Sequence, residues 1–123
     1  MLVAAALAGC DLSSASRPCI CTNEFRFVTA AVVNESGAAE GDISCFTRNE
    51  RTGDTLETVQ NMGPGTIVVA TDANRADVSA RGDTLQVVGT KDTRRFDAEF
   101  VVKTDPCRCH VWKVAGPDTV VLR

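Results

Sequence analysis

Arg95-Phe-Asp-Ala-Glu-Phe-Val-Val-Lys103 is the stretch of the chain that decides its fold. In it, apolar residues alternate with charged ones: Phe96, Ala98 and Phe100 against Arg95, Asp97 and Glu99. A period of two residues is typical of a β-strand with one face on a core and the other in water. The stretch therefore predicts a half-buried strand, with the three apolar side chains inside and the three charged side chains outside.

The rest of the chain is built from short runs rich in β-branched residues, separated by turn clusters. Before the central strand these runs cover residues 25–33, 42–48, 56–60, 66–70, 76–80 and 84–90, and after it 107–114 and 119–122. The run Thr66–Ala70 is compact and apolar, which favours a strand buried on both faces. Since no segment shows a sustained helical period, we expect an all-β fold, an immunoglobulin-like or transthyretin-like sandwich of about seven strands.

The N-terminus resembles a bacterial export signal. Leu2–Gly9 is an unbroken apolar run of eight residues, whereas a membrane-spanning helix needs about 20 and the apolar part of a signal about 7 to 15. Leu7-Ala-Gly-Cys10 has the form of the lipobox and resembles the substrates of lipoprotein signal peptidase, which implies diacylglyceride attachment to Cys10. No Lys or Arg precedes the run, and a start upstream of Met1 would supply one.

This resemblance divides the chain into three parts. Residues 1–9 are expected to be a signal remnant, residues 10–24 the lipidated cysteine and a polar tether, and residues 25–123 one β-sandwich domain. The expected location is the bacterial cell envelope, in either the inner or the outer membrane. The alternative is that residues 1–10 form an apolar strand or a frayed helix with an ordinary cysteine.

Charge argues against two classes of partner. The formal net charge is −3 and the isoelectric point is about 5.1, whereas nucleic acids and anionic lipid surfaces select a basic face. We therefore expect no nucleic-acid partner. A membrane contact through the lipid anchor and an envelope protein or polysaccharide partner remain.

The cysteines form two Cys-X-Cys pairs, Cys19/Cys21 and Cys107/Cys109, near the two ends of the domain. An export signal implies an oxidising compartment, so we expect at least one disulfide between the pairs; the spacing does not decide the connectivity. The alternative is an envelope zinc or copper site, in which the four thiolates and His110 supply sulfur and nitrogen ligands. Structural zinc sites usually space their cysteines more widely, which favours the disulfides.

Other candidate residues suggest little chemistry. Cys45 is the odd thiol and is expected to be buried. His110 is the single histidine, with no nearby serine, so we predict neither an enzyme nor a cofactor. Three further motifs are interpreted as structural: the tripeptide Arg81-Gly-Asp83 as a turn, the aspartates Asp72, Asp77 and Asp83 as turn residues rather than calcium ligands, and Trp112 as a core residue.

Four segments together resemble the carboxypeptidase regulatory-like domain: Val28–Gly37, Gly65–Asn74, Gly82–Val88 and Cys109–Leu122. The resemblance implies a seven-stranded, transthyretin-like sandwich that occurs in bacterial lipoproteins and carries no active site. The chain departs from the family where the family has a Gly-Tyr pair, because it contains Arg94-Arg95 there and no tyrosine. The implied function is that of a lipid-anchored envelope module with a non-catalytic binding or structural role.

Overall fold

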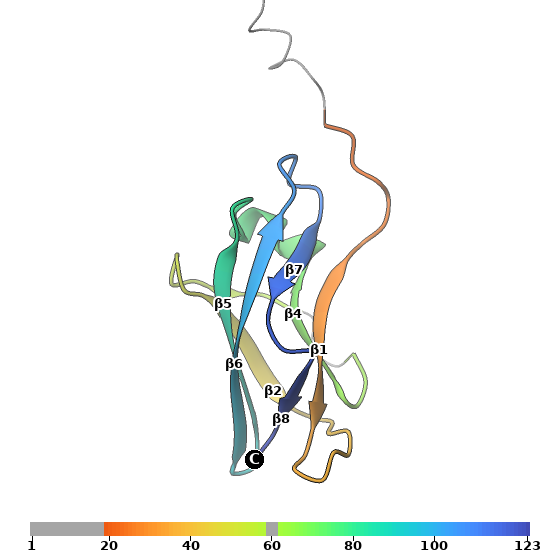
Figure 1. The fold of residues 1–123 in the computed structure, drawn as a ribbon, viewed down its shortest axis with the longest axis vertical. Coiled ribbons are helices and arrows are strands. Elements are labelled where there is room, and N and C mark those ends of the chain that lie inside the picture. Colours follow the sequence, from red (N-terminus) through yellow and green to blue (C-terminus); the bar gives the residue numbers. More distant parts are fainter. Residues whose placement is uncertain (1–18, 59–61) are drawn as a thin grey trace, which may run out of the picture.

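The computed structural model describes residues 19–58 and 62–123, and within these ranges the chain forms eight strands in two sheets (Figure 1). The smaller sheet has the order β4-β1-β8, and the larger has the order β3-β2-β5-β6-β7. The strands are β1 Phe27–Val33, β2 Ser44–Asn49, β3 Thr55–Leu56, β4 Thr66–Thr71, β5 Asp83–Lys91, β6 Arg94–Thr104, β7 Val111–Ala115 and β8 Thr119–Val121. The predicted all-β sandwich is confirmed, with eight described strands rather than about seven.

Strand β6 matches the alternation from which it was predicted. Phe96 and Phe100 are buried and Ala98 packs against the core, while the charged residues between them are exposed. Its antiparallel partner is β5, paired from Asp83 opposite Val102 to Lys91 opposite Arg94. This long hairpin forms the centre of the larger sheet.

Side chains from both sheets form one core between them. The apolar run of β4 is buried on both faces, as its sequence predicts, because Ile67 through Ala70 are all buried. The largest apolar side chains with less than 2 % of their surface exposed are Phe100, Leu85, Leu122, Val32, Val69, Val78, Val87, Val102 and Val111.

The structure corrects several of the predicted strands. The predicted short strand at 76–80 is wrong, because Asp72–Asp77 forms a 3-10 helix, η1, and residues 78–80 lie outside any strand. Thr71 caps this helix: its hydroxyl accepts the Ala73 N–H, while its own N–H donates to the Asn74 side chain. Such a short helix leaves no apolar period to detect.

The second correction concerns the predicted strand 107–114, since β7 begins only at Val111. Before it, Asp105 organises a turn: its backbone carbonyl accepts the Arg108 N–H, and its carboxylate accepts the Cys109 N–H. Arg108 has a φ of +58° there, so the chain cannot continue a regular strand.

The first and last strands lie parallel to each other (Figure 1). Ala31 pairs with Thr119 and Val33 with Val121, so each partner lies 88 residues further along the chain. Beyond β8, Arg123 exchanges backbone hydrogen bonds of 3.0 and 3.2 Å with Arg95 of β6. The end of the chain therefore joins the smaller sheet to the larger one.

Candidate functional site

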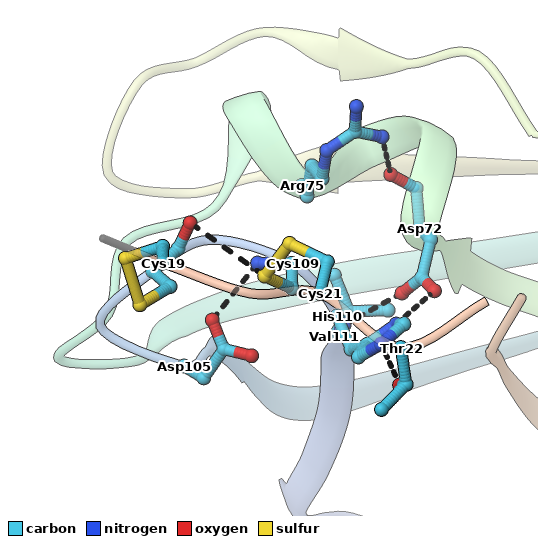
Figure 2. Close-up of a disulfide and its surroundings, with 10 residues drawn as sticks. Cys19, Cys21, Thr22, Asp72, Arg75, Asp105, Cys109, His110 and Val111 are labelled. Atoms are coloured by element: carbon cyan, nitrogen blue, oxygen red, sulfur yellow. Dashed lines mark hydrogen bonds and ion pairs between the residues drawn. A yellow bond between two sulfur atoms is a disulfide. The ribbon is translucent and has the colours of Figure 1, made fainter. Parts of the chain in front are cut away.

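Two disulfides form a ladder where the chain enters the domain (Figure 2). Cys19 is bonded to Cys107 and Cys21 to Cys109, with Cα–Cα distances of 5.6 and 5.4 Å and a sequence separation of 88 in both cases. The predicted bridging of the first pair to the second is therefore confirmed for both bridges. The residues paired between β1 and β8 have the same sequence separation, so the two disulfides lie in register with that strand pair.

The disulfides bear directly on the predicted metal site. The sulfur atoms of these four cysteines are bonded in two disulfides. None of the four is therefore a thiolate that could bind zinc or copper. Within the part of the chain that the structure describes, no three His, Cys, Asp or Glu side chains gather closely enough to hold a metal ion. His110 lies next to the ladder but has other partners.

His110 joins two side chains from distant parts of the sequence (Figure 2). Its Nδ1 lies 2.6 Å from a carboxylate oxygen of Asp72, at the start of η1, and its Nε2 lies 2.8 Å from the Thr22 hydroxyl. His110 and Asp72 are buried, with 8 % and 3 % of their surface exposed, whereas Thr22 is exposed. An ionised Asp72 requires that Nδ1 carry the proton and donate it, so Nε2 accepts from Thr22 when the ring is neutral.

Asp72 is held by several donors at once. One carboxylate oxygen accepts the Val111 N–H at 2.8 Å, and the other accepts the Arg26 N–H at 2.9 Å in addition to the His110 contact. Burial raises the pKa of Asp72, whereas the hydrogen bonds from His110, Arg26 and Val111 lower it. The hydrogen bonds together have the larger effect, so the pKa is below the ordinary value. The carboxylate therefore stays ionised and fixes the imidazole.

The order hydroxyl, imidazole, carboxylate is also that of a catalytic relay. Neither Thr22 nor His110 is among the residues that line the neighbouring groove, however. Sequence analysis missed this trio because its members lie 88 and 38 residues apart, and no local pattern joins them. In the structure the trio fastens the segment after Cys21 to the start of β7 and to η1.

An open groove with a volume of about 400 Å³ begins next to the contacts among Thr22, His110 and Asp72. One wall comes from the start of β1 and the residue before it, and the other from β7 and the turn after it. The lining residues are Arg26, Phe27, Val28, Thr29, Val111, Trp112, Lys113 and Asp118. The groove thus lies between the disulfide ladder and the paired part of β1 and β8.

The rim of the groove carries cations and exposed apolar side chains. Arg26 pairs with Glu24 at 2.5 Å and Lys113 with Asp118 at 2.6 Å. Phe27 is 42 % exposed and packs edge-on against Phe25, which is 53 % exposed. The groove therefore offers apolar contacts and two cations that are each paired with an acidic side chain.

The prediction that Trp112 is a core residue is wrong, because the neighbouring Val111 is the residue whose side chain is buried in the core. Val111 is 1 % exposed, whereas Trp112 is only half-buried. These neighbours point to opposite faces of the strand, and the ammonium group of Lys103 lies 5.5 Å from the centre of the Trp112 ring on the outer face. Trp112 is therefore one wall of the groove.

The remaining candidates have structural surroundings. Cys45 is free and half-buried against the core, and burial raises the pKa of its thiol to about 11. In the Arg81-Gly82-Asp83 tripeptide, the Asp83 side chain is 1 % exposed and bonds Arg51 and Asn49. Arg51 holds the pKa of Asp83 below its usual range despite burial, so this tripeptide does not present its carboxylate to a receptor.

Comparison of the chain with protein-family models, curated proteins and solved structures yields no match. Among the described residues, none belongs to a helix with the length and hydropathy of a membrane span. Cys10, the predicted lipidation site, lies outside the described residues. The predicted third strand, 56–60, is wrong in its described part, because β3 ends at Leu56; residues 59–60 lie outside the described residues.

Proposed function

We propose that this chain is a lipid-anchored module of the bacterial cell envelope, with a non-catalytic binding or structural role. The observation that carries the proposal is the double bridge of Cys19 and Cys21 to Cys107 and Cys109. Disulfides of this kind persist in oxidising compartments, which agrees with the export signal inferred from the sequence. A lipid on Cys10 would be joined to the domain at Cys19 through the eight intervening residues, 11–18, which form a short polar segment.

The position of the bridges suits an anchored domain. Any pull on the segment before Cys19 reaches the domain at the ladder, where two covalent bonds connect it to the turn before β7. Hydrogen bonds from Thr22 to His110 and from Arg26 to Asp72 continue the connection beyond Cys21. The tether is thus fastened to the last strands as well as to β1.

The resemblance of the chain to the carboxypeptidase regulatory-like domain also supports the proposal, because members of that family have a two-sheet sandwich and stabilise or display rather than catalyse. Sandwich domains carry their functions in loops and edges. The groove between β1 and β7 is such an edge, and we assign the binding role to it. The partner would be an envelope protein, with no role for nucleic acid.

The anchoring is tested by expressing the chain in a bacterial host with labelled palmitate, behind an upstream signal that supplies basic residues. We expect label on the wild-type protein and its recovery with membranes. Cys10→Ser should lose both, whereas Cys45→Ser, the matched control at an unbridged cysteine, should keep both. Unchanged labelling and fractionation of Cys10→Ser would refute the anchoring.

A further inference from the structure

Two free strand edges face the groove beside the disulfide ladder. Among the described residues, β1 is paired on the side of β8 from Ala31 to Val33, and no described strand lies beside residues 27–30 on that side. β7 is the last strand of the larger sheet, and within the described ranges its ladder partner is β6. Unpaired edges present rows of N–H and C=O groups, which is the pattern by which proteins bind an extended peptide.

The opening between these edges is held by buried contacts. Thr22 contacts His110 and Ala31 pairs with Thr119, and in both pairs the second residue lies 88 positions after the first. The number of residues from Thr22 to Ala31 therefore equals the number from His110 to Thr119. The lengths would allow the strands to pair throughout. Instead, the Asp72 carboxylate lies between them and accepts the N–H groups of Arg26 and Val111.

This construction makes the groove a preformed site. One end is fixed by the disulfides and the buried Asp72–His110 contact, and the other by the β1–β8 pairing. Binding to a site that is already open loses less conformational entropy than binding to one that must first unfold or separate.

Charge indicates which peptide fits. Besides the carboxylate of Asp118, two cations line the groove, Arg26 and Lys113, in a chain whose net charge is −3. Their present partners are exposed, since the Glu24 and Asp118 side chains have relative exposures of 46 % and 94 %. Ion pairs between such exposed groups are weak, so carboxylates of a ligand can replace them.

The same cations disfavour a second copy of this chain as the occupant. Edge-to-edge pairing of two copies would bring the cations of one groove towards those of the other, and lysine on an edge strand is a common means of preventing self-pairing. The carboxylates of a ligand are attracted by these cations, for which they compete with Glu24 and Asp118.

We propose that the groove binds an extended segment of a partner protein in which acidic residues alternate with apolar ones. Its backbone pairs with the free edges of β1 and β7, and its acidic side chains meet Arg26 and Lys113. Its apolar side chains pack on the exposed Phe27 and Val114. The inference rests on the binding role proposed above, for which it names the partner.

The probe is a blocked hexapeptide of alternating valine and glutamate, titrated into the isotope-labelled full chain in detergent and followed by amide chemical shifts. We expect the shifts to concentrate at residues 27–29 and 111–114. Lys113→Glu should weaken binding about tenfold or more. Arg48→Glu makes the same charge change at an exposed site on β2 and should leave affinity within about twofold.

Three outcomes would overturn the inference. They are equal binding of a valine–lysine hexapeptide, shifts of the same residues by polygalacturonate but not by the peptide, and no shift at the groove. None of these depends on lipidation, which the palmitate experiment reads separately. A chain that is anchored but does not bind the peptide would retain the proposed location and lose only this partner.

Discussion

The ring of Phe96 lies over Gly89, its direct partner across the β5–β6 ladder. A Cβ atom added at Gly89 would lie 2.1 Å from ring atom Cε2 of Phe96 and 2.5 Å from Cζ. The glycine therefore leaves the space that the aromatic ring fills. This pairing allows the larger sheet to hold a phenylalanine against its own backbone.

Gly89→Ala is expected to destabilise the protein by about 1 to 3 kcal/mol, because the added methyl group must displace the Phe96 ring. Phe96→Ala alone should cost about 3 to 5 kcal/mol. In that background, Gly89→Ala should cost almost nothing, since no ring remains to be displaced. Urea denaturation of the four proteins measures this coupling.

Gly41→Ala serves as the control for this cycle, because a Cβ there would contact Pro64 at an ordinary 3.4 Å. It should change stability by less than about 0.5 kcal/mol. Additive effects of Gly89→Ala and Phe96→Ala would contradict the steric account.

Local patterns made the core strands predictable. The alternation around Phe96 and the apolar run of β4 are short-range signals, and both strands have the burial that these signals indicate. The helix η1 gave no such signal, because it depends on hydrogen bonds from the backbone N–H groups of Thr71 and Ala73 to the side chains of Asn74 and Thr71 within a single short segment.

The candidate site was only partly accessible from sequence. The two Cys-X-Cys pairs predicted a covalent link, but the choice of Cys19 with Cys107 follows from the parallel register of the chain ends, which no local pattern contains. The contact of His110 with Asp72 is equally non-local. Groups brought together by topology leave no periodicity to detect.

The effects of removing the two disulfides are expected to be non-additive. A single bridge with a separation of 88 residues stabilises by about 4 to 5 kcal/mol in the chain-entropy treatment, but the second then closes only a short loop, for about 2 kcal/mol. Cys19→Ser/Cys107→Ser and Cys21→Ser/Cys109→Ser should therefore each cost about 2 kcal/mol. Removing both bridges should cost more than the sum, about 6 to 7 kcal/mol.

Denaturant titration of the three variants under identical oxidising conditions measures these differences. Mutating both partners of a bridge avoids leaving a reactive thiol that would re-pair. If the loss from removing both bridges equalled the sum of the two single losses, the ladder would not act as one closure of the chain.

Cys45 should be unreactive in the folded protein. Its thiol pKa is raised to about 11 by burial, so roughly one molecule in a thousand carries the reactive thiolate at pH 8. In Cys10→Ser protein with both disulfides intact, iodoacetamide should label Cys45 slowly in buffer and rapidly in urea. Fast labelling without urea would mean that the thiol is accessible in the folded state.

The stability contributed by Asp72 should depend on pH in one direction. Burial raises its pKa, but hydrogen bonds from His110, Arg26 and Val111 lower it further, so the folded-state pKa lies below the ordinary value. The contribution is therefore complete above about pH 5 and is lost as the pH falls through about 4 and below. Asp72→Asn should cost about 1 to 3 kcal/mol at pH 7, because the amide leaves a buried backbone N–H without its acceptor.

The measurement is the difference in unfolding free energy between the wild type and Asp72→Asn, by urea denaturation at pH 7, 5, 4 and 3. The difference should be constant between pH 7 and 5 and shrink at the two lower values, since protonation removes the same acceptor from the wild type. The control is Asp97→Asn at an exposed position on β6, which should stay within about 0.5 kcal/mol of the wild type throughout. A difference for Asp72→Asn that grows on acidification would show that the carboxylate is not the acceptor that fastens Arg26 and Val111.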